Sequence, residues 1–246
     1  MGSNLIDTED REIQSVAEVR RAFRERPNAI CAVIIEPIQC EGGENHFRKE
    51  FLSELRRACD EFEALLIFDE VQTGVAATGR FWCYQHFDVV PDVLAFGKKM
   101  QVCGVLAGPR IDEVERNVFV ESSRINSTWG GNLVDMVRAQ RILEIIEADD
   151  ICKHAAKQGE FLMNGLRHLG QQDERITNIR GRGLLCAFDL PNQDVRDAAK
   201  KLAMEKGLLV LGAGQRAIRL RPPLNVKKPE LEHALMLIDD TLKSLK

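Results

Sequence analysis

Short apolar runs alternate along the first half of the chain with segments in which apolar residues recur every three or four positions. Continuous runs of this length are typical of strands buried within a sheet. They predict strands at residues 30–35, 64–68, 92–96 and 102–107. The helical spacing predicts amphipathic helices at residues 8–28 and 48–62, and the segment 79–87 is read as a short helix.

This alternation favours an α/β fold, with a mostly parallel sheet covered by helices on both faces. Ligands of such sheets bind beyond the carboxyl ends of the strands. Glu36, Asp69 and Lys98 each lie at or just beyond the end of a predicted strand. We therefore expect their side chains to border one site.

The pattern changes in the second half of the chain. Two helices are predicted at residues 133–147 and 151–169, and further helices at 194–206 and 229–244. Strands are predicted at 184–190, 208–211 and 217–220. These elements predict a smaller α/β unit with its own core. We assign residues 1–145 to a larger domain and residues 146–246 to a C-terminal small domain.

Composition removes several classes of function. The net charge is -4 and the basic residues are dispersed, which argues against a nucleic-acid partner. No apolar run is long enough to span a membrane, and the first residues lack the pattern of a secretion signal. The seven cysteines form no C-x-x-C pair and the five histidines are scattered. We expect a reduced, cytoplasmic protein with no metal site.

Asp69 and Lys98 together suggest a specific chemistry. A lysine amine forms a Schiff base with an aldehyde cofactor, and a carboxylate keeps the nitrogen of a pyridine ring protonated. Taken alone, each residue has a simpler reading, because Lys98 can be a solvated surface lysine and Asp69 a helix cap. Gln72 and Gly74, which follow Asp69, compose a segment suited to a ligand loop.

The segment 126–132, Asn-Ser-Thr-Trp-Gly-Gly-Asn, precedes a predicted helix. It is either a turn closed by Asn132 as the N-cap, or an anion site built from hydroxyls, glycine amides and the helix N-terminus.

Arg219 lies on an apolar strand. Its side chain either reaches out to solvent or binds a substrate carboxylate with both arms of its guanidinium. Glu41 lies in a glycine-containing loop beyond a strand end.

Read together, the motifs of this chain resemble those of the class III (omega) aminotransferases, which are fold type I enzymes that depend on pyridoxal 5'-phosphate. The likeness runs from about residue 25 to the C-terminus. The segments that carry it are 36–39, 41–43, 69–74, 91–93, 97–100, 127–132 and 219–224. Within the family, residues 96–105 and 180–188 resemble the lysine 6-aminotransferases more closely. The 4-aminobutyrate aminotransferases are the rival, since they share the Lys-Lys-Met run.

The resemblance implies a role for each matching residue. Lys98 is the Schiff-base lysine and moves the proton, and Asp69 holds the ring nitrogen. Gln72 holds the ring hydroxyl. Thr128 reaches the cofactor phosphate of a partner subunit, which implies a homodimer. Asn126 is expected to contact the substrate.

The resemblance also implies two substrates. Closed against each other, Glu41 and Arg219 present a neutral surface to the amine end of lysine. Opened, the pair frees Arg219 for the carboxylate of 2-oxoglutarate. The products implied are 2-aminoadipate 6-semialdehyde and glutamate.

This chain departs from the family at its N-terminal side. Family members carry a long N-terminal part that supplies a phosphate-binding loop, an aromatic platform and a carboxylate-binding arginine, and none of these is expected here. Three hypotheses follow: an active enzyme, a non-catalytic fragment, or a Schiff-base enzyme of another type. The third is disfavoured because a simple lysine aldolase needs no partner for a ring nitrogen.

Overall fold

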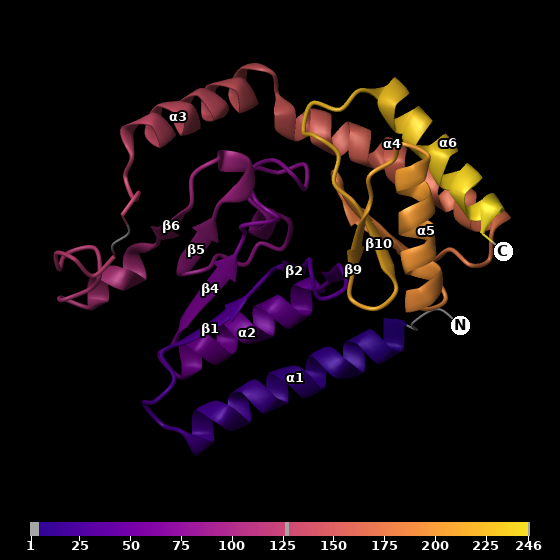
Figure 1. Ribbon diagram of the computed structural model, residues 1–246. Helices are drawn as coiled ribbons and strands as arrows, with labels where there is room; N and C mark the ends of the chain where they lie inside the picture. The colour runs from indigo at the N-terminus through magenta and orange to yellow at the C-terminus, as the bar shows by residue number, and fades with distance from the viewer. Residues whose placement is uncertain (1–4, 126–127, 246) are drawn as a thin grey trace.

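The computed structural model describes residues 5–125 and 128–245, which form two four-stranded sheets and the helices that pack on them (Figure 1). Asn126, predicted to contact the substrate, lies outside the described residues, as does Ser127. The arrangement confirms the predicted α/β class.

The first sheet has the strand order β1-β4-β5-β6. These strands span Ala32–Ile35, Leu65–Asp69, Val93–Phe96 and Gly104–Ala107. β1, β4 and β5 are parallel, whereas β6 runs antiparallel to β5. The link from β5 to β6 is shorter than the dozen or so residues that a parallel crossover requires. The sheet is therefore mostly parallel, as predicted, with one antiparallel edge strand.

Two helices lie beneath this sheet, α1 (Leu5–Glu25) and α2 (Lys49–Glu61) (Figure 1). The apolar face of α2 packs against Leu66 and Phe68 of β4 in one core cluster. Burial of these side chains away from water is the main term that holds the layers together.

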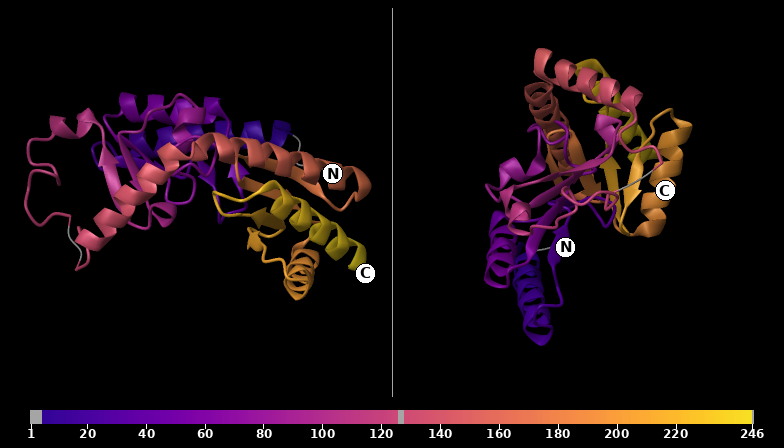
Figure 2. Two further views of the ribbon diagram at one scale, coloured as in Figure 1. Left: turned by 90° about the horizontal axis from the view of Figure 1, so that it is seen from above. Right: turned by 90° about the vertical axis from the view of Figure 1, so that its left-hand side faces the viewer.

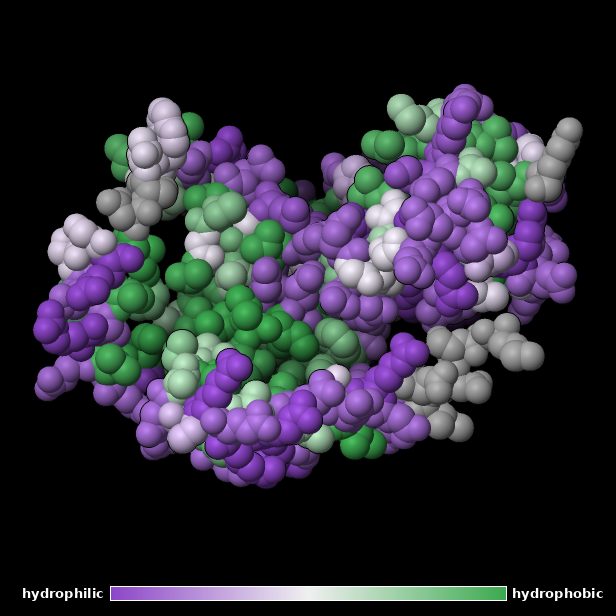
Figure 3. All heavy atoms as spheres, turned by 60° about the horizontal axis from the view of Figure 1, so that its bottom comes forward, coloured by the Kyte–Doolittle hydropathy of each residue, from purple (hydrophilic) through white to green (hydrophobic). Residues whose placement is uncertain are grey.

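The opposite face of the first sheet is more open. Ile34 of β1 is 65% exposed, so the prediction of a fully buried strand at residues 30–35 is wrong for the described structure. The physical reason is that β1 lies at the sheet edge, where only Val33 and Ile35 face the α2 side. Hydrophobic side chains gather in a hollow on this part of the molecule (Figure 3).

Short elements lie around the strand ends. β2 (Ile38–Gln39) and β3 (Asn45–His46) form a small hairpin. Three single-turn 3₁₀ helices follow, η1 at Cys83–His86, η2 at Lys98–Met100 and η3 at Pro109–Glu113. The helix predicted at 79–87 is thus reduced to η1.

The second sheet has the order β7-β8-β10-β9 and is antiparallel throughout. Its strands span Thr177–Arg182, Leu185–Asp189, Ala217–Leu220 and Leu211–Ala213 in that order. Helices α4, α5 and α6 pack on it, at Ile151–Gln172, Gln193–Glu205 and Lys228–Ser244. Most of its core residues form a cluster separate from that of the first sheet, although Leu185 of β8 belongs to the cluster of the first sheet.

Helix α3 (Leu133–Ala148) runs into α4 along the molecule (Figure 2). The side chain of Asn132 accepts a hydrogen bond from the Val134 N–H at 2.9 Å and so caps α3. The N-cap reading of Asn132 is thereby confirmed. No helix in the described part of the chain is both long and apolar enough to cross a membrane.

The two sheets meet through a backbone contact at Gly183. This residue has φ 53°, and a Cβ placed on it would lie 2.4 Å from the Thr78 carbonyl carbon. The next residue, Leu184, donates its N–H to the Ala77 carbonyl at 2.9 Å. Only glycine combines this left-handed conformation with so close an approach. The contact fixes the second sheet beside the strand ends of the first.

Candidate active site

The predicted acid and amine follow neighbouring parallel strands. Asp69 is the last residue of β4 and lies opposite Ala95 of β5. Lys98 begins the η2 turn that follows β5, and its φ of 46° lies in the left-handed region. A side chain other than glycine is held there at a cost of about 1–2 kcal/mol. The sheet thus presents both residues at one edge, as the sequence predicted.

Asp69 has the geometry to receive a protonated ring nitrogen. Its Oδ1 accepts the Val71 N–H at 3.0 Å, which fixes the carboxylate, and among the described residues Oδ2 has no donor. Beside it lies a hollow of about 390 Å³ lined by Ile34, Ile35, Glu36, Gln39, Phe47 and Asp69. A half-buried carboxylate with one oxygen free at a hollow fits a cationic heterocycle such as a pyridinium.

Two adjacent lysines of η2 lie in different surroundings. Lys98 is exposed. Lys99 is half-buried, and its Nζ donates to the Gln72 carbonyl at 3.0 Å. Burial lowers the pKa of Lys99 to about 8, and the nearby Arg221 guanidinium adds to the effect. The enclosed amine is therefore that of the second lysine, a difference that the sequence did not predict.

Glu41 and Arg219 form an ion pair between the two sheets. The Arg219 side chain is only 8% exposed, whereas that of Glu41 is 72% exposed. The alternative in which Arg219 reaches out to solvent is therefore wrong. Its Nη1 also lies 3.5 Å from Gln72 Oε1, next to Asp69. The guanidinium thus joins the predicted substrate pair to the predicted cofactor loop.

A second ion pair lies directly behind the first. Arg221, the residue that directly follows β10, binds Glu44, whose side chain is completely buried. Burial raises the pKa of Glu44, while Arg221 and other arginines oppose that change. The side chain of the neighbouring His46 is largely but not fully buried, and this desolvation lowers its pKa to about 3. His46 is therefore neutral, and Arg221 is the close counter-charge of Glu44.

The loop that carries both glutamates is held from the second sheet. Arg180 of β7 donates to the carbonyls of Gly43 and Glu44 at 2.6 and 2.7 Å. Gly43 has φ 133°, a conformation that glycine adopts readily. The Gly214 N–H donates to the Glu41 carbonyl at 3.0 Å. These bonds fix the loop backbone, so movement of Glu41 is confined to its side chain.

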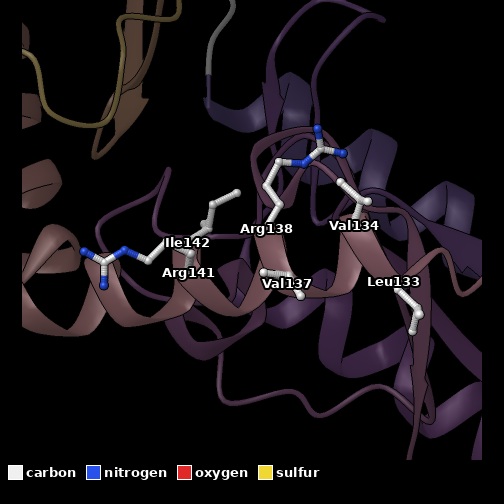
Figure 4. A pocket seen from close by; sticks show the side chains of 6 residues that line it. All are labelled: Leu133, Val134, Val137, Arg138, Arg141 and Ile142. Carbon is white, nitrogen blue, oxygen red and sulfur yellow. The ribbon is translucent and has the colours of Figure 1, made fainter.

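Thr128 lies in the turn before α3 and is exposed, with no hydrogen bond in the described structure to Asp69, Gln72 or Lys98. The adjoining surface of α3 forms an open hollow lined by Leu133, Val134, Val137, Arg138, Arg141 and Ile142 (Figure 4). Leu133 is 81% exposed.

The structure therefore brings Gln72, Glu41 and Arg219 into contact, with Asp69 three residues before Gln72 and Lys98 on the turn after the neighbouring strand. Sequence reasoning missed Lys99, Arg180 and the Glu44–Arg221 pair. The available signal was that two glutamates, Glu41 and Glu44, lie close together in one loop and that two arginines, Arg219 and Arg221, lie close together in one segment. It becomes meaningful only when the loop is known to lie against β10.

Comparisons with known proteins agree with these features. A family profile described as Aminotransferase class-III matches residues 3–242. The chain is 50% identical to L-lysine-epsilon aminotransferase of Mycobacterium tuberculosis over 232 residues, which cover 94% of this chain and 52% of that protein. It is 32% identical to mitochondrial 4-aminobutyrate aminotransferase of Sus scrofa over 241 residues, 97% of this chain and 47% of that protein.

A solved structure is similar over nearly the whole chain. It is the lysine aminotransferase from M. tuberculosis in the internal aldimine form, with a TM-score of 0.93 and 49% identity. The match covers 96% of this chain and 54% of that one. The chain thus spans about half the length of the curated relatives that it matches.

Proposed function

Because the chain belongs to the class III aminotransferases, we propose that it supplies the acid, the reactive lysine and the substrate switch of a lysine 6-aminotransferase that uses pyridoxal 5'-phosphate. One observation carries this proposal. The Glu41–Arg219 pair meets Gln72 within three residues of Asp69, at the same sheet edge that leads to Lys98. The greater identity to lysine aminotransferases than to a 4-aminobutyrate aminotransferase supports lysine as the donor.

Each residue has a defined task in this proposal. Pyridoxal phosphate, when bound, supplies a ring that takes up the electron pair left on the substrate carbon. Asp69 would keep the ring nitrogen protonated, and Gln72 would hold the ring hydroxyl. Lys98 Nζ would hold the aldehyde of the cofactor and would serve as the acid/base that moves a proton between the substrate carbon and the cofactor carbon. Its exposure leaves the amine open to both the aldehyde and the substrate.

The Glu41–Arg219 pair accounts for two unlike substrates at one site. With the pair closed, the amine end of lysine meets a surface of no net charge. When Glu41 turns away, Arg219 binds the distal carboxylate of 2-oxoglutarate with both arms of its guanidinium. The exposure of Glu41 supports this movement, because its carboxylate stays hydrated in either position. The products are 2-aminoadipate 6-semialdehyde and glutamate.

The same proposal covers the domains and the assembly. Residues 1–145 are the later part of a cofactor-binding domain, and residues 146–246 form the small domain. Thr128 reaches the cofactor phosphate of a partner subunit in a homodimer, and the exposed apolar surface of α3 supports such a contact. All seven cysteines are free, which supports a reducing compartment, and we place the protein in the cytoplasm.

The proposal is tested by covalent trapping. The chain is mixed with pyridoxal phosphate, reduced with borohydride and digested, and the modified peptide is identified by mass spectrometry. We expect the adduct on Lys98, its loss in Lys98→Ala, and no change in Lys153→Ala, a distant exposed lysine. An adduct spread over surface lysines, or one that persists in Lys98→Ala, would contradict the assignment.

The amino donor is tested by measuring glutamate formed from 2-oxoglutarate with lysine or 4-aminobutyrate. We expect lysine to be the faster donor. Faster turnover with 4-aminobutyrate would favour the rival family members instead. An adduct on Lys98 without turnover by either donor would favour the hypothesis of a non-catalytic fragment.

A further inference from the structure

Lys99 makes a contact that the proposed chemistry does not use. Its Nζ donates to the Gln72 carbonyl at 3.0 Å, a bond that joins the η2 turn after β5 to the loop after β4. The neighbouring Lys98 makes no such bond among the described residues and is exposed. The two lysines therefore differ in place and in bonding, although they are adjacent in sequence.

The hydrogen bond of Lys99 is made to Gln72, the residue at which the loop after β4 meets the Arg219–Glu41 pair. The side chain of Gln72 lies 3.5 Å from Arg219 through Oε1, and Arg219 binds Glu41. The backbone before Gln72 is held by the Glu70 N–H, which donates to the Ala95 carbonyl at 2.9 Å. Lys99 holds the carbonyl of Gln72 itself. A continuous series of contacts thus runs from the η2 turn through Lys99 and Gln72 to Arg219.

We infer that Lys99 is a positioning residue, whose amine fixes the Gln72 loop and thereby sets the place of the Arg219 guanidinium. The inference rests on the proposed function, because Gln72 and Arg219 take their tasks from it. A donor held against a carbonyl in half-buried surroundings restricts backbone rotation more than a solvated lysine does. The amine has a hydrogen to donate in both its charged and neutral forms, so the bond persists across the physiological pH range.

The same substitution can be made at Lys99 and at the adjacent Lys98, so that the second variant serves as the control for the first. Lys99→Met keeps the aliphatic stem but removes the donor, and Lys99→Arg restores a donor at similar reach. Lys98→Met is the matched control, because it removes an amine without a bond to the loop. The readout is amide hydrogen exchange of Val71 and Gly74 without cofactor, followed by titration with pyridoxal phosphate.

In Lys99→Met we expect exchange at Val71 and Gly74 to rise about tenfold, the size expected for one charge-assisted hydrogen bond. Lys99→Arg should return exchange to within about twofold of the parent, and Lys98→Met should leave it unchanged. The apparent dissociation constant for the cofactor should rise about tenfold in Lys99→Met and recover in Lys99→Arg.

Two results would overturn the inference. One is parent-like exchange at Val71 and Gly74 in Lys99→Met. The other is an equal rise across β8, which would show a general loss of stability and not a local effect. Failure of the proposed function has a different signature, because it requires that the parent chain form no adduct on Lys98, whatever the exchange of the loop.

Discussion

Two ion pairs join the same loop to β10 and to the residue that follows it, and they differ mainly in their access to water. Glu41 and Arg219 meet at the surface, whereas Glu44 and Arg221 meet in the interior, where the Glu44 side chain has no exposed area. The carboxylate of the outer pair can leave its partner and stay hydrated. That of the inner pair has no hydrated position to move to. The Glu41–Arg219 pair is therefore able to open, whereas the Glu44–Arg221 pair holds the loop in place.

The largest effect is expected at the inner pair. Glu44→Ala leaves the Arg221 guanidinium without its counter-charge in the interior, which typically lowers the free energy of unfolding by about 3–5 kcal/mol. Urea denaturation followed by circular dichroism measures the change. Glu41→Ala, the matched control at the outer pair, should lower the same quantity by about 1 kcal/mol or less. Equal losses in the two variants would remove the distinction between the pairs.

The backbone contact at Gly183 gives the next largest effect. Gly183→Ala places a methyl group 2.4 Å from the Thr78 carbonyl carbon and leaves φ at 53°. We expect a loss of about 1–3 kcal/mol in the free energy of unfolding from strain alone, with a further loss from the contact. Gly207→Ala is the control, because Gly207 also has positive φ but a Cβ there has no atom within 4 Å. Thermal denaturation of both variants measures the two contributions: Gly207→Ala gives the cost of positive φ alone, and the additional loss in Gly183→Ala gives the cost of the close contact.

Lys99 lies near Arg221 and adds a pH dependence to this region. Its pKa is about 8 in the folded chain and 10.5 ordinarily. Between these values the unfolded chain binds the proton more tightly, so the free energy of unfolding rises with pH, by up to about 1.4 kcal/mol per unit. Denaturation from pH 7.5 to 10.5 should show a flatter rise in Lys99→Met than in the parent. Identical slopes would mean that Lys99 is not enclosed.

The smallest effect on stability is expected from Glu41→Gln, because the outer pair is largely exposed on the Glu41 side. The change should lower the free energy of unfolding by less than about 1 kcal/mol. It should nevertheless weaken the closed pair and raise affinity for dicarboxylates, which calorimetric titration with 2-oxoglutarate measures. A variant that binds 2-oxoglutarate less tightly than the parent would argue against a switch at this position.

The pattern of apolar runs was sufficient to predict most strands and the place of the site. β4 and β5 form where the runs at 64–68 and 92–96 predicted them, because a continuous apolar segment has few other stable places. β7 was missed, since Thr177–Arg182 contains no apolar run and its pairing with β8 is a tertiary effect. The exposure of Ile34 was missed for a related reason, because a sequence does not show which strand lies at an edge.

The sequence predicted several residues of the candidate site, but it did not predict the contacts that those residues make. Asp69, Lys98 and Glu41 were identified from residue type and position at or beyond strand ends, and Arg219 from its place on an apolar strand. The half-buried amine of Lys99 was not, because two adjacent lysines differ only once the η2 turn orients them. The inner pair was missed as well, since Glu44 and Arg221 are far apart in sequence and meet only through the packing of two sheets.

The most direct test of the distinction between the two ion pairs is to observe both guanidinium groups while substrate is added. The Nε–H signals of Arg219 and Arg221 are assigned by NMR with Arg219→Lys and Arg221→Lys, and 2-oxoglutarate is then titrated into the cofactor-loaded chain. We expect the Arg219 signal to shift in a saturable way and the Arg221 signal to stay in place. A shift of Arg221 as large as that of Arg219, or no shift of Arg219, would contradict the assignment of the outer pair as the substrate switch.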